Sequence, residues 1–371
     1  MGSKKNVLLC LPHFQNNHIS YYTNLMDDIF NEDEVTVIAY TFNRDFIKKS
    51  QKTPTYFPKK GDTVGYFLLK NIGLFRKADI IIFEELYKLS PVSVAFIMVF
   101  GKKIVLTIHN VNKWFKRGNS KTFKQKITTF IITQITKKVK GIITVSLSLK
   151  KYIEEEKLFN KAVYYIPFTK INNQKKHAKN VGEDIIFTIP GTINSDRRDY
   201  KFVLEVFYEL LEKQPLKIKL FLLGKLVKLS EYEVALILKI NQIQPNTVTY
   251  WESFVSDEEF DEVLKKTNYL IGNIKLQYTE NRILEEYGKS KETGILFLML
   301  NYQIPGLFPE GYFSHEIYKE LIIYYQENKS SFKEIVSILS KREEEIPPFL
   351  NFEKHENLIR EEINNLNNAF V

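Results

Sequence analysis

The chain has 371 residues, of which 44% are hydrophobic and 14% aromatic, and 53 Lys and Arg against 44 Asp and Glu give a formal charge of +9. Gly (15) and Pro (12) are too scarce for a fibrous or disordered chain, and the length predicts two domains that each bury a core. The single cysteine, Cys10, excludes an internal disulfide and favours a reducing compartment.

Short apolar runs alternate with helix-length segments through the first half of the chain. Several of these runs are apolar throughout, as strands buried on both faces of a parallel sheet must be. The first run follows the N-terminus directly and favours a strand over a signal peptide, because Pro12 and His13 interrupt it. The predicted strands of this half are Asn6–Leu11, Val35–Tyr40, Asp79–Phe83, Lys103–Ile108, Gly141–Val145 and Val163–Ile166.

A polar segment without periodicity, residues 172–182, separates this half from a second array of the same kind. Its predicted strands are Asp184–Ile189, Ile218–Leu223, Thr247–Tyr250, Tyr269–Ile271 and Gln303–Phe308, and its predicted helices include Asp199–Lys213, Asp257–Lys266 and Ser314–Gln326. The pattern predicts an α/β protein with two doubly wound, Rossmann-like domains, residues 1–170 and 171–350. An amphipathic helix over Asn351–Phe370 follows them.

The net charge is unevenly distributed. Residues 1–170 carry +15 and residues 171–371 carry −6, and the window 101–150 holds eleven Lys, Arg117 and no acidic residue. A basic half favours an anionic partner such as phospholipid, nucleic acid or a phosphorylated substrate. A lysine-rich solvated surface is an equally weighted explanation of this window.

Several chemistries are excluded by missing motifs. The first strand-to-helix turn, residues 11–18, has no glycine, which argues against a dinucleotide site, and neither a Walker sequence nor a Gly-x-Ser-x-Gly elbow occurs. The six histidines and the lone cysteine lack metal-ligand spacing, so we expect no metal and no bound cofactor.

Three loops after predicted strands carry candidate chemistry, because ligands of doubly wound domains bind at the carboxyl ends of the strands. His109 ends the strand Lys103–Ile108, where it can contact a substrate hydroxyl or phosphate; the alternative is a histidine satisfied by a backbone carbonyl. Gly191 gives a tight exit to a loop that holds Arg197 and Arg198, whose planar forks suit phosphate oxygens unless nearby aspartates pair with them at the surface.

The third loop runs from Glu285 to Gly294 and precedes an apolar helix. The free N–H groups at that helix start, with Ser290 and Thr293 as cap candidates and Lys289 and Lys291 nearby, form an anion site suited to a diphosphate. An ordinary capped helix is the alternative.

In order and spacing, these pieces resemble the nucleotide-sugar glycosyltransferases of the two-Rossmann-domain GT-B architecture, family 4-like. The resemblance covers nearly the whole chain through the segments 105–110, 141–152, 165–167, the Gly191 loop, 221–224 and 254–260. It implies a donor site in the second domain, an acceptor site in the first, retention of anomeric configuration, no metal, and a last helix that returns to the first domain.

The chain departs from the family in two places. The family's Glu-x7-Glu pattern is broken, since the second position is Leu298 and only six residues separate Glu285 from Glu292. The glycine pair of the first loop is replaced by His13, Asn17 and His18.

The sequence therefore predicts a cytoplasmic glycosyltransferase that moves a sugar from a nucleotide-diphosphate sugar to a glycan or lipid-linked acceptor. The expected catalytic residues are His109, Glu292, Arg197 and Arg198. The donor-binding set is Gly191, Thr192, Asn194, Gly224, Lys225, Phe254, Glu285, Lys289, Ser290, Lys291, Thr293 and Gly294, and the acceptor-binding set is His13, Asn17, His18 and Lys113. The alternative is a non-catalytic sugar-binding or scaffold subunit, favoured by the broken pattern.

The segment Ser120–Lys140 adds a hypothesis about the acceptor. Phe123, Ile127, Phe130, Ile131, Ile135 and Val139 recur at helical spacing among lysines, so the Lys-rich residues 113–140 suit the inner face of an anionic membrane. The favoured alternative packs the apolar stripe on the first sheet and leaves the lysines to the membrane. A nucleic-acid partner is not expected, because no strand interleaves basic and stacking aromatic residues.

Overall fold

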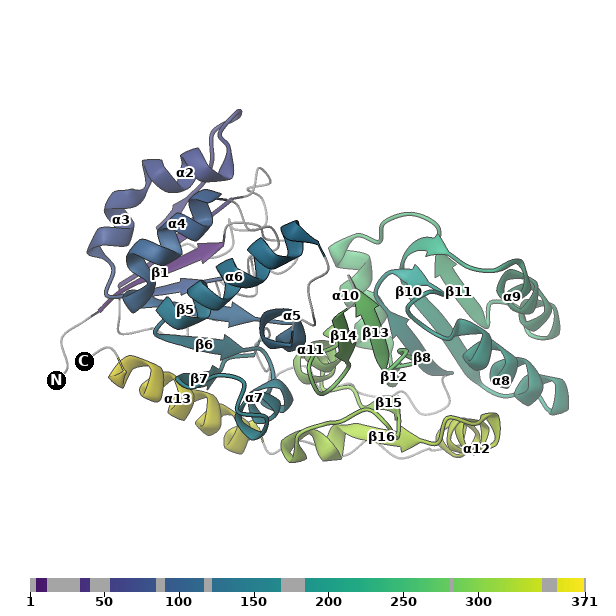
Figure 1. Ribbon diagram of the computed structural model, residues 1–371. Helices are drawn as coiled ribbons and strands as arrows, with labels where there is room; N and C mark the ends of the chain where they lie inside the picture. The colour runs from purple at the N-terminus through teal and green to yellow at the C-terminus, as the bar shows by residue number, and fades with distance from the viewer. Residues whose placement is uncertain are drawn as a thin grey trace.

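The computed structural model describes residues 5–11, 34–40, 54–84, 91–116, 122–167, 184–280, 283–341 and 352–369. Within them the chain forms two α/β units, each built around its own seven-stranded parallel sheet, and a last helix that packs on the first unit (Figure 1). The predicted fold class is therefore confirmed. The segment that was predicted to separate the domains lies outside the described residues.

The first sheet has the strand order β3-β2-β1-β4-β5-β6-β7. The chain moves outward from β1 in one direction and then returns to β4 on its other side, so the switch point of this domain lies between β1 and β4. The strands are β1 (Asn6–Leu11), β2 (Glu34–Ala39), β3 (Thr55–Tyr56), β4 (Ile80–Phe83), β5 (Ile104–Ile108), β6 (Gly141–Thr144) and β7 (Ala162–Tyr165).

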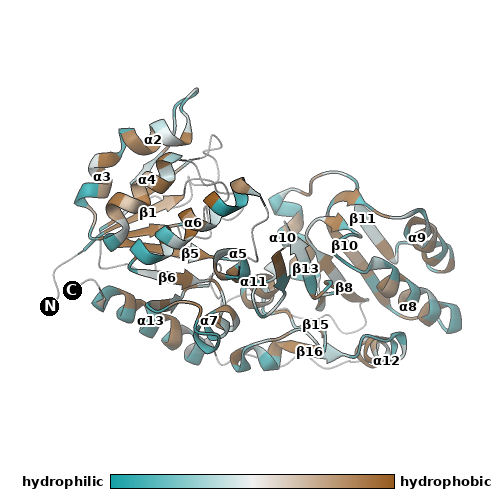
Figure 2. Ribbon diagram, viewed as in Figure 1, coloured by the Kyte–Doolittle hydropathy of each residue, from teal (hydrophilic) through white to brown (hydrophobic). Residues whose placement is uncertain are grey.

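Burial explains these strands. Every residue of β4, β5 and β6 is buried, as central strands covered on both faces must be, and the six predicted strands agree with the structure to within two residues. The helices of this domain are α2 (Val64–Lys70), α3 (Ile72–Lys77), α4 (Pro91–Phe100), α5 (Val111–Phe115), α6 (Phe123–Lys138) and α7 (Leu147–Glu155), with a 3-10 turn η1 (Gly101–Lys103). Figure 2 shows the apolar strands enclosed by helices that carry both hydrophilic and hydrophobic residues.

The second sheet has the order β11-β10-β8-β12-β15-β16, with β9 paired to the far end of β10. Its strands are β8 (Ile185–Pro190), β9 (Ile193–Asn194), β10 (Ile218–Lys228), β11 (Val248–Trp251), β12 (Tyr269–Ile271), β15 (Gly306–Pro309) and β16 (Ile322–Tyr325). Its helices are α8 (Tyr200–Lys213), α9 (Glu231–Ile243), α10 (Asp257–Lys266), α11 (Gly294–Tyr302) and α12 (Lys329–Ser340), with the 3-10 helix η2 (Glu316–Leu321). The chain reverses direction between β8 and β12, which places the switch point there.

One prediction for this domain is wrong, and one element was not predicted. The helix predicted over Ser314–Gln326 is instead η2 followed by β16, because the run from Ile322 to Tyr325 is β-branched and aromatic and pairs with β15 along the sheet. The loop before α11 contains an antiparallel hairpin, β13 (Gln277–Glu280) with β14 (Ile283–Glu286), that the sequence did not indicate.

The C-terminal helix α13 (Phe352–Asn368) returns to the first domain as predicted. Ile363 and Leu366 are buried in the first core, and Glu362 forms an ion pair with Lys150 of α7 at 2.5 Å. Lys5, at the start of β1, donates to the carbonyl of Asn367, so the two ends of the described chain lie together (Figure 1). No helix among the described residues is long and apolar enough to cross a membrane.

Candidate functional site

The two domains meet where the strand β5 and the hairpin strand β14 end. Asn110, two residues beyond β5, forms an isolated antiparallel bridge with Lys291, and Val111 N–H donates to the Ser290 carbonyl at 2.8 Å. The Asn112 side chain donates to the Leu284 carbonyl at 2.8 Å. These hydrogen bonds join the carboxyl-terminal edges of the two sheets. We call this contact between residues 110–112 and 284–291 the seam, and the predicted loops lie along it.

Glu285 is the carboxylate at the centre of the seam. It is only 3% exposed, and its oxygens accept from the N–H groups of Asn112 and Lys113, at 3.4 and 2.9 Å, and from the Ser290 hydroxyl at 2.5 Å. Burial raises the pKa of Glu285, while the bonds from Ser290, Lys113 and Asn112 oppose that rise. Glu285 therefore caps the N-terminus of α5 from the opposite domain, and both of its oxygens already accept hydrogen bonds from the protein.

The arginine loop leaves the carboxyl end of β8 through a close backbone crossing. Gly191 has φ +95°, a conformation that disfavours other residues, and a Cβ added at Gly224 of β10 would lie 2.3 Å from the Gly191 carbonyl oxygen. Both predicted glycines are thus required by geometry: one for the turn and the other for the approach of the loop to β10. Their exchange for larger residues would displace the arginines that follow.

Arg197 and Arg198 reach the seam from this loop. Arg197 lies with its guanidinium 3.5 Å from the Tyr287 hydroxyl and over the Tyr278 ring, and Lys291 lies over the same Tyr278 ring. Arg198 is more deeply placed: burial lowers its pKa, and its Nη1 is enclosed without a hydrogen-bond partner. An enclosed guanidinium nitrogen without a hydrogen-bond partner is costly unless an anion accepts from it, as a phosphate oxygen would.

The N-terminus of α11 lies in the same region. The Thr293 side chain caps the helix by accepting from Ile295 N–H at 3.3 Å, and a Cβ at Gly294 would meet nothing within 4 Å, so the first turn is open. Ser290 is not a cap: its hydroxyl donates to Glu285 and accepts from Glu286 N–H. The exposed first turn can receive an anion.

Glu292 stands between this helix and the first domain. Its Oε1 accepts from the Tyr312 hydroxyl at 2.6 Å and from Thr293 N–H at 2.8 Å, whereas Oε2 is enclosed without a partner. Burial raises its pKa to about 7, against the opposing effects of Tyr312, Thr293 and the Ser146 side chain from the first domain. At neutral pH this carboxyl group can therefore either accept or donate a hydrogen bond to a sugar hydroxyl.

His109 is held inside the first domain. Its Nε2 lies 2.9 Å from Oε1 of Glu84, a carboxylate 4% exposed that directly follows β4. The pair fixes the ring at the end of β5, one residue before the Asn110–Lys291 bridge. His109 thus lies at the end of β5, one residue from the loop of the second domain that Asn110 contacts, and its ring is bonded by a carboxylate rather than by a backbone carbonyl.

The remaining predicted residues are dispersed around this centre. Thr192, Lys225 and Phe254 are exposed, with Phe254 66% exposed, and Asn194 accepts from the Asp196 amide through its side chain. Lys289 pairs with Glu286 at 3.1 Å and lies over the Tyr152 ring of the first domain, while Lys113 contributes its backbone N–H to Glu285. His13, Asn17 and His18 lie outside the described residues, so the acceptor side is untested.

Three side chains at the site were not predicted. Glu84 and Asn273 each follow an apolar strand, a position that should have singled them out, and Asn273 is 3% exposed with both amide atoms unpartnered at the β8–β12 switch point. Tyr312, in the loop after β15, is fully buried and donates to Glu292. Nothing in the sequence around Tyr312 distinguishes it from a core tyrosine.

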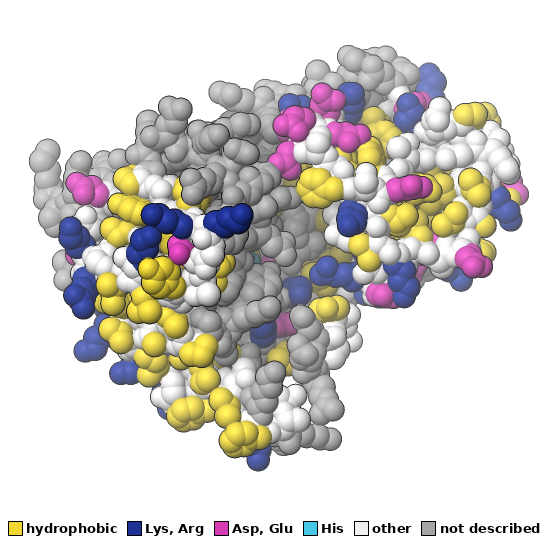
Figure 3. All heavy atoms as spheres, turned by 90° about the horizontal axis from the view of Figure 1, so that it is seen from above, with side chains coloured by type: hydrophobic (Ala, Val, Ile, Leu, Met, Phe, Trp, Pro, Cys, Tyr) yellow, Lys and Arg dark blue, Asp and Glu magenta, His cyan; other side chains and the backbone are white. Residues whose placement is uncertain are grey.

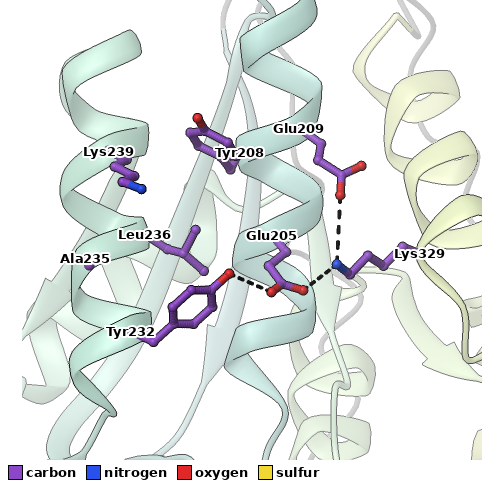
Figure 4. Close-up of a pocket in the computed structure, with 8 residues that line it drawn as sticks. All are labelled: Glu205, Tyr208, Glu209, Tyr232, Ala235, Leu236, Lys239 and Lys329. Carbon is purple, nitrogen blue, oxygen red and sulfur yellow. Dashed lines mark hydrogen bonds and ion pairs between the residues drawn. The ribbon is translucent and has the colours of Figure 1, made fainter.

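Two pockets help to delimit the site. One of about 440 Å³ is lined by Glu310, Tyr312, Phe313 and Tyr324, and Lys151 of α7 lies over the Phe313 ring, so this pocket borders the seam. The other, of about 260 Å³, lies between α8 and α9, away from the seam (Figure 4). In this pocket the carboxylate of Glu205 already accepts from the Tyr232 hydroxyl and from Lys329. The pocket is therefore a surface groove whose charged groups are paired with one another.

Among the described residues, no group of three His, Cys, Asp or Glu side chains is gathered so as to hold a metal ion.

No protein-family model and no curated protein sequence matches the chain. Its fold does match solved structures. HepE of Anabaena, solved with UDP and glucose, has a TM-score of 0.62 over 98% of both chains at 11% identity. The lipopolysaccharide outer core galactosyltransferase WaaB has a TM-score of 0.54 over 98% of both chains at 12% identity. A UDP-N-acetylglucosamine 2-epimerase has a TM-score of 0.56 over 97% of this chain and 95% of its own at 10% identity.

These similarities establish the fold that the sequence resemblance implied, the GT-B arrangement of two Rossmann-like domains. Because one fold serves a transferase and an epimerase, function must be argued from the site.

Proposed function

We propose that the protein is a glycosyltransferase that uses a nucleotide-diphosphate sugar. The observation that carries the proposal is the enclosed, unpartnered Nη1 of Arg198, which lies in the loop after β8 of the second domain and interacts electrostatically with Tyr287. The solved structure of HepE with UDP and glucose, on the same fold, supports this class of ligand.

In this proposal the second domain stabilises the departing diphosphate. Arg197, Arg198 and the free N–H groups of the α11 first turn would offset the negative charge that grows as the bond to the sugar breaks, which is the largest contribution in such reactions. Glu292 and His109 would hold hydroxyls of the donor sugar. The unpartnered Oε2 of Glu292 supplies a hydrogen-bonding position that no protein group fills.

The finer features follow the family resemblance. We propose that transfer retains the anomeric configuration, needs no metal or bound cofactor, and delivers the sugar to a lipid-linked or polysaccharide precursor acceptor on the first domain. A cytoplasmic enzyme that meets its acceptor at the inner face of the membrane would fit the basic first domain. Anomeric configuration in the product, read by NMR with chelator present, tests retention and metal independence together.

Nucleotide binding tests the donor site. We expect Arg198→Met to weaken the binding of the matching nucleoside diphosphate by about 10- to 100-fold, because a charge-assisted hydrogen bond is lost. Calorimetry with UDP, GDP and ADP measures it. Arg76→Met, an exposed arginine on α3, is the matched control and should bind as wild type does. Equal affinity in Arg198→Met would remove the arginine from the site.

Turnover separates the proposal from its alternative. Nucleotide release from UDP-, GDP- and ADP-sugars, with product sugars identified, distinguishes transfer or hydrolysis from epimerisation. Thermal stabilisation by a nucleoside diphosphate without any turnover would instead favour a non-catalytic sugar-binding or scaffold subunit. Undiminished turnover in Arg197→Ala/Arg198→Ala would contradict the assigned mechanism.

A further inference from the structure

Helix α6 carries apolar side chains on two faces, only one of which packs. Ile132 and Ile135 are buried in the first core. Phe123, Ile127 and Phe130, spaced four and three residues apart on one stripe, are 79%, 44% and 63% exposed. The prediction that the apolar stripe of this segment is simply the face packed on the sheet is therefore wrong for these three residues.

The exposed stripe belongs to a larger surface. Helices α2, α4 and α6 are neighbours in one layer on the first sheet, and α2 and α4 add Tyr66 and Leu69, 58% and 50% exposed, and Val99, 74% exposed. We call these six residues the α2–α4–α6 face. Elsewhere in the described part of the first domain, Tyr56 alone is a large hydrophobic residue exposed to a comparable degree. Figure 3 shows hydrophobic side chains gathered over this domain beside Lys and Arg.

The charge along α6 has one sign. Lys126, Lys137 and Lys138 of α6 are exposed, and residues 101–150 contain no acidic residue, whereas Asp62 lies just before α2. An exposed apolar stripe flanked by lysines on the same helix is complementary to partners that are both apolar and anionic. A second copy that paired through the same face would bring the same lysines together and be repelled.

We propose that the α2–α4–α6 face docks on an anionic lipid bilayer. The stripe of Phe123, Ile127 and Phe130 enters the boundary between headgroups and acyl chains, with α6 in the plane of the membrane and its lysines on lipid phosphates. The inference rests on the proposed function, because it deepens the acceptor to one that is carried on a lipid.

Sedimentation with vesicles tests the docking. The full chain is mixed with vesicles of phosphatidylcholine alone and with vesicles that also contain phosphatidylglycerol, at low and high salt. We expect binding to the anionic vesicles that weakens as salt rises, since exposed charges are screened. Phe123→Ser/Phe130→Ser should lower the partition coefficient at least about tenfold, and Lys126→Glu/Lys137→Glu/Lys138→Glu should do the same.

Matched variants on the second domain serve as controls. Leu238→Ser/Ile338→Ser removes side chains that are 60% and 57% exposed, and Lys213→Glu/Lys239→Glu/Lys266→Glu makes the same change in net charge. Both should bind vesicles within about twofold of wild type.

Three results would overturn the proposal: no binding to anionic vesicles, equal binding by Phe123→Ser/Phe130→Ser, or self-association in solution that this variant abolishes. The last would identify a protein interface. Nucleotide binding measured without vesicles separates the two proposals. Vesicle binding by a chain that binds no nucleotide would contradict the proposed function alone, whereas nucleotide binding without vesicle binding would contradict the docking alone.

Discussion

Glu292 is a carboxyl group that folding removes from water and supplies with bonds to only one of its oxygens. Tyr312 and Thr293 N–H both donate to Oε1, and Oε2 has no partner. The burial that raises its pKa to about 7 is a cost to folding, and such costs accumulate where a site is prepared for a ligand. The stability of the empty protein should therefore depend on this residue and on pH.

The sign of that dependence follows from proton binding. Between about pH 4.5 and 7 the folded protein retains at Glu292 a proton that the unfolded chain has released, so its contribution to stability is lost as pH rises. Glu292→Gln keeps an acceptor for Tyr312 and Thr293 but cannot ionise. We expect it to raise the free energy of unfolding by up to about 3 kcal/mol at pH 8 and to leave it unchanged near pH 4.

Urea unfolding at the two pH values measures this difference, with the exposed Glu262→Gln of α10 as control. The same gain at both pH values would show that ionisation of Glu292 is not the cause. Sugar turnover should fall in Glu292→Gln whatever its stability.

For single residues, the sequence indicated which loops hold candidate side chains better than it indicated which residues those side chains contact. His109, Arg198 and Thr293 were singled out as candidates because strand ends and helix starts are visible in the order of residue types. Glu285 was placed correctly in its loop but not in its role, because its partners, Asn112 and Lys113 N–H, lie 172 or more residues away. Periodicity reports the face a residue occupies and carries no information on such distant contacts.

Helix α5 depends on the other domain for its cap. Asn110, its N-cap residue, makes no side-chain capping bond, and the carboxylate of Glu285 takes that place. A five-residue helix is too short to be stable alone, so this bond helps to form α5 as well as to join the domains.

Removal of the Glu285 carboxylate should weaken both helix α5 and the contact between the domains. Glu285→Ala leaves two backbone N–H groups and the Ser290 hydroxyl buried without partners, and we expect it to lower the free energy of unfolding by about 2–4 kcal/mol. Calorimetry should also resolve two transitions where wild type shows one. Glu286→Ala, which removes a surface pair with Lys289, should cost at most about 0.5 kcal/mol, and an equal loss in both variants would argue against a capping role.

Elements were predicted where one pattern dominated. The central strands of both sheets, α8 and α10 each show a single periodicity and were placed to within a few residues. Ser314–Gln326 failed because a 3-10 turn and a strand in sequence imitate helical spacing, and β16 is specified by its pairing with β15. In α6 both faces are apolar, so the sequence could not indicate which one packs.

The whole molecule is joined by a buried polar chain at α13. The hydroxyl of Tyr165, at the end of β7, contacts Tyr318 of the second domain at 2.8 Å and His355 of α13 at 2.9 Å. Burial lowers the pKa of His355 to about 4, with a smaller effect from His315. His355 thus contacts Tyr165 of the first domain, and Tyr165 is in turn hydrogen-bonded to Tyr318 of the second domain.

The titrations of His355 and Glu292 should change the free energy of unfolding in opposite directions as pH falls. Between about pH 6.5 and 4 the unfolded chain binds a proton at His355 that the folded protein refuses, so this contribution to stability is lost as pH falls. The contribution of Glu292 has the opposite sign over most of the same pH range. We expect His355→Gln, which can still bond Tyr165, to lose up to about 3 kcal/mol of that acid sensitivity.

Relative to wild type, the free energy of unfolding measured from pH 4 to 8 should fall with rising pH in His355→Gln and rise with rising pH in Glu292→Gln. Parallel profiles for the two variants would exclude opposed titrations.

The return of α13 to the first domain also bears on how the chain is made. Ile363 and Leu366 belong to the same core as β1, yet they leave the ribosome some 350 residues after it. While the second domain is synthesised, the first must wait with an open apolar groove beside β7, where a chaperone or its own nascent segments compete for the place of α13. Completion of the first domain thus waits until α13 has been made, after the whole of the second domain.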